Sequence, residues 1–216
     1  KNRLLMKMQG KILKMLTELK TPVQYNLPMG DGLLNMNQWI GKNIQFRFSG
    51  DIYCLDCGNR TKKSFNQGFC YPCFRDSPMA AECIIKPELC RAHLGEGRDV
   101  EWERKHHLKD HYVYLAVSSG VKVGITRDTQ VPTRWIDQGA SYAVPIAKTP
   151  NRYLCGVIEV ALKAYLSDRT AWQRMLKNEI AHIDLAAKRD EIIQLIPEKY
   201  HGRFSVFRIS MLEKFC

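Results

Sequence analysis

Four cysteines in two Cys-x-x-Cys pairs constrain this chain more than any other feature of its sequence. The stretch CLDCGNRTKKSFNQGFCYPC contains Cys54, Cys57, Cys70 and Cys73, with twelve residues between the pairs. Each pair presents two thiolates from one turn, and two facing turns complete the tetrahedron that Zn²⁺ prefers. A redox dithiol is normally a single pair in a thioredoxin-like pattern, which is missing here. The spacing therefore predicts a structural zinc site, with a dithiol site or two disulfides as the alternatives.

A second group of candidate metal ligands follows the first. Its members are Cys83, Cys90, His93 and His107. Their spacing is looser than that of zinc fingers, and buried free cysteines with surface histidines are the alternative interpretation. The sequence thus predicts one structural Zn²⁺ and allows a second, whose fourth ligand stays open.

The positive charge of the chain is unevenly distributed. The net charge is +11, and the first 50 residues hold eight Lys or Arg against two acidic residues, whereas residues 51–111 hold ten of each. A basic chain favours polyanionic partners such as nucleic acid, although solvated surface lysines explain the excess equally well. Nucleic acid is therefore the partner that we expect, with DNA and RNA both open.

Hydrophobic periodicity divides the chain into three regions. Residues 1–50 form a basic flank, residues 51–111 the cysteine and histidine module, and residues 112–216 a mixed module of strands and helices. In the flank, residues 4–20 have the spacing of an amphipathic helix and residues 42–50 alternate as a strand. The last region predicts a hairpin at 111–127, a strand at 141–148, a strand at 204–210, and helices at 133–138, 155–166 and 171–195. The predicted fold class is α+β, with a zinc-ribbon-like N-terminal module followed by a small sheet with flanking helices.

The sequence also bears on the compartment. No apolar run approaches the roughly 20 residues that span a bilayer. Paired cysteines at metal-ligand spacing are typical of a reducing environment. We therefore expect a cytoplasmic protein.

The hairpin HYVYLAVSSGVKVGITR and the segments after it resemble the GIY-YIG nuclease superfamily. Tyr114 matches the tyrosine of the first motif and Gly124 the glycine of the second, while Arg134 and Glu159 match the arginine and glutamate of the two later helices. The sequence departs from the pattern where VYL stands in place of GIY and where Lys122 takes the place of the second tyrosine. The resemblance implies a GIY-YIG-like module over residues 112 to about 166.

This resemblance also implies a role for each matching residue. Glu159 would ligate one Mg²⁺ or Mn²⁺, and the ion would stabilise the leaving oxygen of a phosphodiester. Tyr114 would act as general base, with its pKa lowered toward neutral by Lys122 and the metal. Arg134 would clamp the phosphate and Lys122 would hold it. Helical spacing alone favours the alternative that Glu159 and Lys163 form an ordinary solvent-facing ion pair.

The chain contains the paired cysteines and the segments GFCYPCF, KPELC and RWIDQGA. In these features, residues 43 to 210 are similar to the bacterial family catalogued as domain of unknown function 2797, which carries no established activity. Basic residues around the predicted 155–166 helix suit contacts with phosphates. The candidates for these contacts are Arg127, Arg152, Arg169 and Arg174.

Three functional hypotheses follow from these patterns. The first is a zinc-stabilised, nucleic-acid-binding phosphodiester hydrolase that depends on a divalent metal. The second is a catalytically silent nucleic-acid-binding module on the same scaffold. The third is a structural zinc protein that binds another protein.

Overall fold

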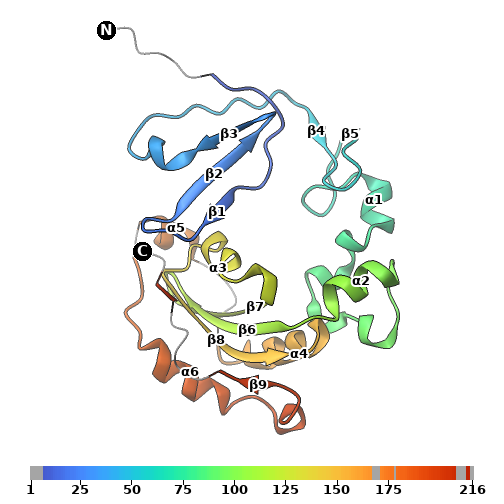
Figure 1. Ribbon diagram of the computed structural model, residues 1–216, viewed down its shortest axis with the longest axis vertical. Helices are drawn as coiled ribbons and strands as arrows, with labels where there is room; N and C mark the ends of the chain where they lie inside the picture. Colours follow the sequence, from blue (N-terminus) through green and yellow to red (C-terminus); the bar gives the residue numbers. More distant parts are fainter. Residues whose placement is uncertain (1–6, 167–170, 178, 208–212, 215–216) are drawn as a thin grey trace.

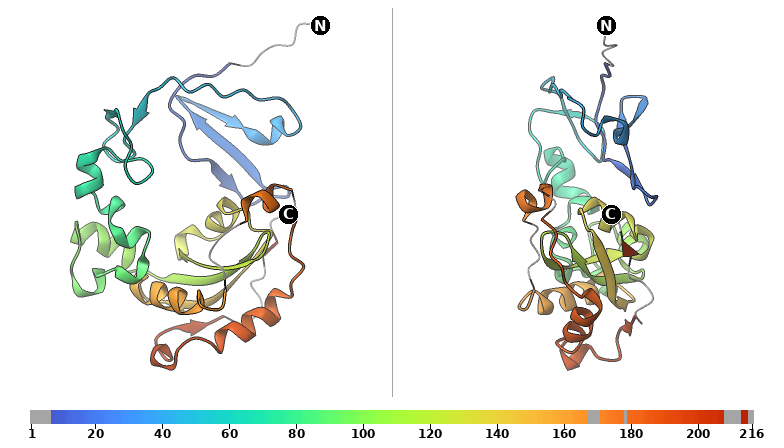
Figure 2. Two further views of the ribbon diagram at one scale, coloured as in Figure 1. Left: turned by 180° about the vertical axis from the view of Figure 1, so that it is seen from behind. Right: turned by 90° about the vertical axis from the view of Figure 1, so that its left-hand side faces the viewer.

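Strands in the described part of the chain form three antiparallel sheets. The computed structural model describes residues 7–166, 171–177, 179–207 and 213–214. The three-stranded sheet lies at one end of the molecule and the five-stranded sheet near the other, with the cysteine-rich segment along one side between them (Figures 1 and 2). The chain is thus a mixture of helix and sheet, as predicted, whereas its division into three domains stays a prediction.

The N-terminal sheet contains β1 (Leu16–Glu18), β2 (Gln24–Met29) and β3 (Gly32–Asn35), followed by a 3₁₀ turn at Met36–Trp39. The helix predicted over residues 4–20 is therefore wrong where the chain is described, and residues 4–6 lie outside the described residues. Gly10 has a φ of 149°, and a Cβ at this position would lie 2.5 Å from Gly30 Cα. The close approach of these two backbones prevents a continuous helix.

The strand predicted at residues 42–50 is also wrong. Every residue from 41 to 50 is exposed, and the structure shows no sheet pairing in this segment. Phe46 is 60% exposed and Phe48 74% exposed. Alternating apolar residues form a strand only where a second strand pairs with them, and the described residues offer none here.

Short elements dominate the cysteine-rich segment. Its regular elements are β4 (Ile52–Tyr53), β5 (Arg60–Thr61), α1 (Tyr71–Asp76) and α2 (Val100–His107). Four 3₁₀ turns lie between α1 and α2, at Pro78–Ala80, Glu82–Ile84, Pro87–Leu89 and Ala92–Leu94. The two buried clusters of this segment are small and contain cysteines, so apolar burial contributes little to its stability.

The C-terminal sheet has the strand order β10-β8-β6-β7, and β9 also pairs with β8. Its strands are β6 (His111–Val117), β7 (Val121–Arg127), β8 (Tyr142–Thr149), β9 (Ser205–Val206) and β10 (Glu213–Lys214). The predicted hairpin and the predicted strand at 141–148 are confirmed. The strand predicted at 204–210 is confirmed at β9, while residues 208–210 lie outside the described residues.

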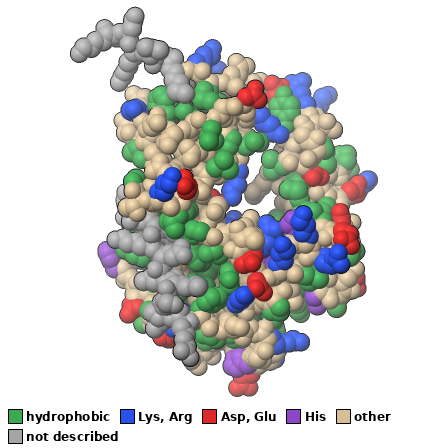
Figure 3. All heavy atoms as spheres, in the orientation of Figure 1, with side chains coloured by type: hydrophobic (Ala, Val, Ile, Leu, Met, Phe, Trp, Pro, Cys, Tyr) green, Lys and Arg blue, Asp and Glu red, His purple; other side chains and the backbone are tan. Residues whose placement is uncertain are grey.

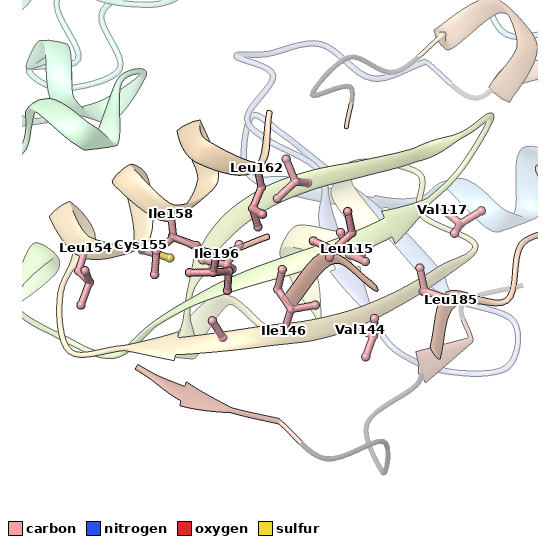
Figure 4. Close-up of a cluster of buried hydrophobic side chains, with 14 residues drawn as sticks. Leu115, Val117, Val144, Ile146, Leu154, Cys155, Ile158, Leu162, Leu185 and Ile196 are labelled. Atoms are coloured by element: carbon pink, nitrogen blue, oxygen red, sulfur yellow. The ribbon is translucent and has the colours of Figure 1, made fainter. Parts of the chain in front are cut away.

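Alternation along β6 gives the large sheet two different faces. Val113, Leu115 and Val117 belong to the main core, which also contains residues of α4 (Arg152–Leu162) and α6 (Leu185–Ile193) (Figure 4). Tyr114 and Ala116 pack on the other face with Trp135 of α3 (Thr133–Asp137). The sequence period of two predicts this separation of Tyr114 from the valines.

The helices begin where polar side chains cap them. Asn151 accepts a hydrogen bond from Leu154 N, so α4 begins three residues before the predicted start at 155. The single helix predicted at 171–195 is wrong: the structure has α5 (Trp172–Leu176) and then α6, which Asp184 caps. A last 3₁₀ turn covers Glu198–Tyr200. No helix in the described ranges is long and apolar enough to cross a membrane.

The N-terminal sheet contacts the C-terminal module through α3. β1 lies beside this helix, and Lys14 Nζ donates to Asp137 Oδ2 at 2.5 Å. The pair is exposed on the lysine side, so it contributes about 1 kcal/mol or less. The contact orients the basic flank near α3 without burying much surface.

We predict that Gly124→Ala destabilises the fold. Tyr114 and Gly124 are partners across β6 and β7, and a Cβ on Gly124 would lie 2.7 Å from Tyr114 Oη. Because Tyr114 is fully buried, we expect a loss of about 1–3 kcal/mol in the free energy of unfolding, measured in urea. Gly120→Ala is the matched control, since a Cβ at Gly120 would have nothing within 4 Å. An equal loss in both variants would contradict the proposed clash.

Candidate active site and metal clusters

A cleft of about 380 Å³ lies between the cysteine-rich segment and the C-terminal sheet. Residues 122–127 of β7 all line it, and successive strand residues face opposite sides of a sheet. The cleft therefore runs along the edge of the sheet, where β7 is the last strand. Figure 3 shows Lys and Arg side chains gathered where α2 meets this sheet.

The cleft brings together the residues that were predicted to be catalytic. These are Tyr114 from β6, Lys122 from β7, Arg134 from α3 and Glu159 from α4, and Gly124 lines the same cleft. Four separate elements supply the four side chains. Their convergence depends on the tertiary fold, because Tyr114 and Glu159 lie 45 positions apart in the sequence.

Tyr114 is the most deeply buried of these residues. Its hydroxyl donates to Gln138 Oε1 at 2.7 Å, and its ring makes an edge contact with Trp135. Burial raises the pKa of Tyr114 to about 12, and the nearby Arg134 only partly offsets this effect. The prediction that Lys122 and a bound metal together lower this pKa toward neutral concerns the metal-loaded site, and it stays a prediction.

Lys122 is also buried, with 6% of its surface exposed. Burial lowers the pKa of Lys122 to about 8, and the positive charge of Arg134 lowers it further. Arg134 is exposed on α3 and lies four residues before Gln138. Arg134 and Gln138 are therefore on the same face of this helix. An anion bound between the two cations would stabilise both of them.

Glu159 contributes the acidic group of the cleft. It is 8% exposed, and its Oε1 lies 3.7 Å from Lys163 Nζ. The predicted ion pair therefore exists, but it faces the cleft and not the open solvent, because both side chains line the cleft. A carboxylate oxygen in this position could ligate a hard divalent cation.

The arginines predicted to contact nucleic acid have different surroundings. Arg127 lines the cleft at the end of β7, and burial lowers its pKa. Arg174 lies outside the cleft and pairs with Glu179 at 3.1 Å. Arg169 lies outside the described residues. The contact of these arginines with nucleic acid stays a prediction.

Arg152 joins the two parts of the molecule that form the cleft. Its Nε donates to the carbonyl of Cys83 at 2.9 Å and its Nη2 to the carbonyl of Ile84 at 2.8 Å. Burial lowers the pKa of Arg152. Two donors of the Arg152 guanidinium thus bind backbone carbonyls, and these contacts position the cleft wall. A contact of Arg152 with phosphate stays a prediction.

The four-cysteine cluster has the geometry of a metal site. The Sγ atoms of Cys54, Cys57, Cys70 and Cys73 all lie within 4.8 Å of one another. Cys57 and Cys70 are 3.8 Å apart, which matches the edge of about 3.8 Å in a tetrahedron with Zn–S bonds of about 2.3 Å. The cluster could therefore hold a structural metal such as zinc.

Local backbone geometry supports this cluster. Gly58 and Gly68 have φ values of 73° and 150°, which side chains other than glycine rarely allow. Burial disfavours the thiolate of Cys54, but hydrogen bonds from the backbone of Cys70, Cys57 and Asp56 outweigh it and lower the pKa to about 6. A thiolate is the form of cysteine that binds a metal.

A second cluster contains Cys83, Cys90, Glu103 and His107, all of them buried. His107 Nδ1 lies 3.5 Å from Cys90 Sγ and 3.7 Å from Glu103 Oε2. The hydrogen bond from Cys83 lowers the pKa of Cys90 to about 4, and the pKa of Cys83 is raised in turn. Cys90 is therefore the member of this cluster that forms a thiolate most readily.

The sequence prediction missed Glu103 and included His93 instead. His93 lies outside the cluster, where its ring stacks on Tyr153 at 4.4 Å. Glu103 and His107 are four residues apart on α2, so their side chains lie on the same face of the helix. The Glu103 carboxyl also packs against Gly97, where a Cβ would lie 2.3 Å from its carboxyl carbon. The i, i+4 spacing of Glu103 and His107 was the signal available in the sequence.

The fold and these sites define a mixed helix-and-sheet protein with two clusters able to hold metal and a cationic cleft beside one of them. The chain belongs to the family described as protein of unknown function (DUF2797), which matches residues 41–214. No curated protein and no solved structure matches the chain.

The low pKa of Lys122 is directly measurable. We expect its Cε resonance to titrate with a midpoint near pH 8, so the side chain is cationic below this pH and neutral above it. Arg134→Gln should raise the midpoint, because it removes a neighbouring positive charge. The measurement is ¹H–¹³C NMR, with Lys122→Arg to assign the signal. A midpoint that stays near the ordinary lysine value would contradict this description of the cleft.

Proposed function

We propose that the cleft binds a phosphodiester of nucleic acid and hydrolyses it with one Mg²⁺ or Mn²⁺ at Glu159. The observation that carries the proposal is the convergence of Tyr114, Lys122, Arg134 and Glu159 on one cleft from four elements. The order and types of these residues resemble a GIY-YIG nuclease. The convergence supports the resemblance, because an unrelated sheet has no reason to bring these four side chains together.

The charge of the cleft supports a phosphate ligand. Among the described residues, its lining contains five Lys or Arg side chains and a single acidic side chain, Glu159. Phosphate contacts in nucleic-acid complexes come mainly from Arg and Lys. A cleft with this charge would attract a polyanion such as nucleic acid.

Each residue has a role in this proposal. Lys122 and Arg134 hold the non-bridging oxygens of the phosphate, and the planar fork of Arg134 suits two parallel hydrogen bonds. Glu159 provides the carboxylate for the divalent cation, which would supply Lewis-acid stabilisation of the leaving oxygen. In the free protein Tyr114 keeps its proton and donates it to Gln138 Oε1. With a cation at Glu159 and Lys122 beside it, the pKa of Tyr114 would fall, and its phenolate oxygen would accept the proton of the attacking water.

The catalytically silent binding module is the second candidate function. The high pKa of Tyr114 favours it, because a tyrosine that keeps its proton cannot activate water. Lys122 also stands where the nuclease pattern has a second tyrosine. Both candidates require the cleft to bind phosphate, and they differ only in cleavage.

The proposal also assigns Zn²⁺ to the two clusters. The all-thiolate set of Cys54, Cys57, Cys70 and Cys73 suits zinc, and four protein ligands leave no open position for catalysis. Cys83, Cys90, Glu103 and His107 would hold a second structural zinc with mixed ligands. Nucleic acid would then be the partner and zinc would stabilise the segment that covers the cleft.

Cleavage tests the first function directly. We expect the protein to cut DNA or RNA in Mg²⁺ or Mn²⁺, and Glu159→Gln and Tyr114→Phe to lower the rate by about 100-fold or more. The substrates are plasmid, branched DNA and structured RNA. Glu191→Gln and Tyr165→Phe are matched controls outside the cleft, and they should keep the parent rate. Binding without cleavage in all variants would establish the silent module instead.

Metal content tests the two clusters. We expect two zinc ions per chain by mass spectrometry, one fewer in Cys57→Ser, and one fewer in His107→Gln. His93→Gln is the matched control for His107→Gln, because His93 lies outside the cluster. Loss of zinc in His93→Gln but not in His107→Gln would contradict the ligands proposed for the second cluster.

A further inference from the structure

The cleft has two chemically different sides, which come from different parts of the chain. Residues before the C-terminal sheet provide an apolar wall, defined as Ile84, Ile85, Pro87, Trp102 and His106. Residues of the sheet module provide the cationic side, with Lys122, Arg127 and Arg134. A ligand that uses both sides needs an apolar, flat part and an anionic part in one small unit.

The apolar wall is accessible to a ligand. Ile85 is 66% exposed, and Trp102 and His106 are only partly buried. The rings of Trp102 and His106 stack at 4.1 Å between centroids and 20° between planes. The wall thus offers aromatic and aliphatic surface beside a group of cations.

The apolar wall is also held in place before any ligand arrives. His106 Nδ1 lies 2.6 Å from the carbonyl of Trp102, and Asp99 caps α2 by accepting from Trp102 N at 2.9 Å. His107 makes an edge contact with Trp102 at 5.4 Å and belongs to the second cluster. Binding on such a wall costs little ordering entropy.

We propose, resting on the phosphate-binding function above, that the cleft takes one unpaired nucleotide, with its base on the apolar wall and its phosphate on the cationic side. A duplex presents phosphates on its outside and keeps its bases stacked inside, so the apolar wall would add nothing to its binding. An unpaired base can stack on an aromatic side chain. Single-stranded, frayed or flipped nucleic acid is therefore the substrate class.

The size of the cleft agrees with this ligand. At about 380 Å³ it lies near the lower end of the roughly 300–1,000 Å³ typical of pockets for small molecules. This volume suits a ligand of the size of one nucleotide and is too small for a double helix to enter. A phosphate-binding groove for duplex would be open and lined by charge along its length.

The experiment compares three probes of equal length by fluorescence anisotropy with the full chain: single-stranded DNA, the same sequence as duplex, and a single strand with abasic sites. We expect the single strand to bind at least about 10-fold tighter than the other two, since base stacking is lost in both. An RNA strand of the same sequence should show the same preference over its own duplex.

Two variants separate the apolar wall from the phosphate contacts. Trp102→Ala should weaken binding of the single strand by about 5- to 100-fold and leave the abasic strand unchanged. Ile85→Ser should act in the same direction, and we expect it to keep the fold because Ile85 is 66% exposed. Trp172→Ala is the matched control, because Trp172 is 60% exposed on α5 and outside the cleft lining.

The outcomes distinguish this inference from the proposed function. Equal affinity for duplex and single strand, or equal losses on the abasic strand, would overturn the unpaired nucleotide and leave phosphate binding intact. If no probe binds, or if Lys122→Ala and Arg134→Ala leave the affinity of every probe unchanged, the phosphate-binding function fails as well. Loss of base-dependent binding in Trp102→Ala and Ile85→Ser alone would support the inference.

Discussion

The contact between Arg152 and the backbone of the cysteine-rich segment joins the two parts of the molecule that line the cleft. Arg152 begins α4 and donates to the carbonyls of Cys83 and Ile84. One turn further along, Gly156 lies so close to this segment that a Cβ would be 2.5 Å from the carbonyl carbon of Pro87. Buried carbonyls without such a partner are costly, so the arginine and the glycine together fix how the two parts meet. This contact therefore helps to hold the apolar wall opposite β7, and both line the cleft.

The same contact links the second cluster to the cleft. Cys83 offers its carbonyl to Arg152 and its thiol to the cluster. His107 belongs to the cluster and also lines the cleft next to Trp102. A metal in the cluster would therefore stabilise the cleft wall through His107. This arrangement explains why a segment with little apolar core could still hold a defined wall.

The parts of the structure that the sequence predicts are those in which the determining contacts are local. Alternation of Tyr114 with the valines of β6 follows from strand geometry, and Cys54 to Cys73 carry their spacing in the chain itself. The prediction fails where distant backbones decide the outcome. The close contact between the backbones of Gly10 and Gly30 is one such case, because strand pairing forms there in place of the expected N-terminal helix. Likewise, Glu103 joins the second cluster because α2 packs over Cys83 and Cys90. The residues around His93 contain no pattern that predicts this packing.

The opposite pKa shifts of Lys122 and Tyr114 have one cause, and it bears on what the cleft can bind. Burial raises the pKa of Tyr114 and lowers that of Lys122, since it disfavours the charged form of both. Arg134 adds to the shift of Lys122, so two cations lie close together where solvent is partly excluded. A phosphate between them would restore the pKa of Lys122 toward its ordinary value, and the lysine would stay protonated in the complex over the neutral range. A neutral ligand would leave this unfavourable interaction between Lys122 and Arg134 in place, which supports the proposal that the cleft binds a phosphate.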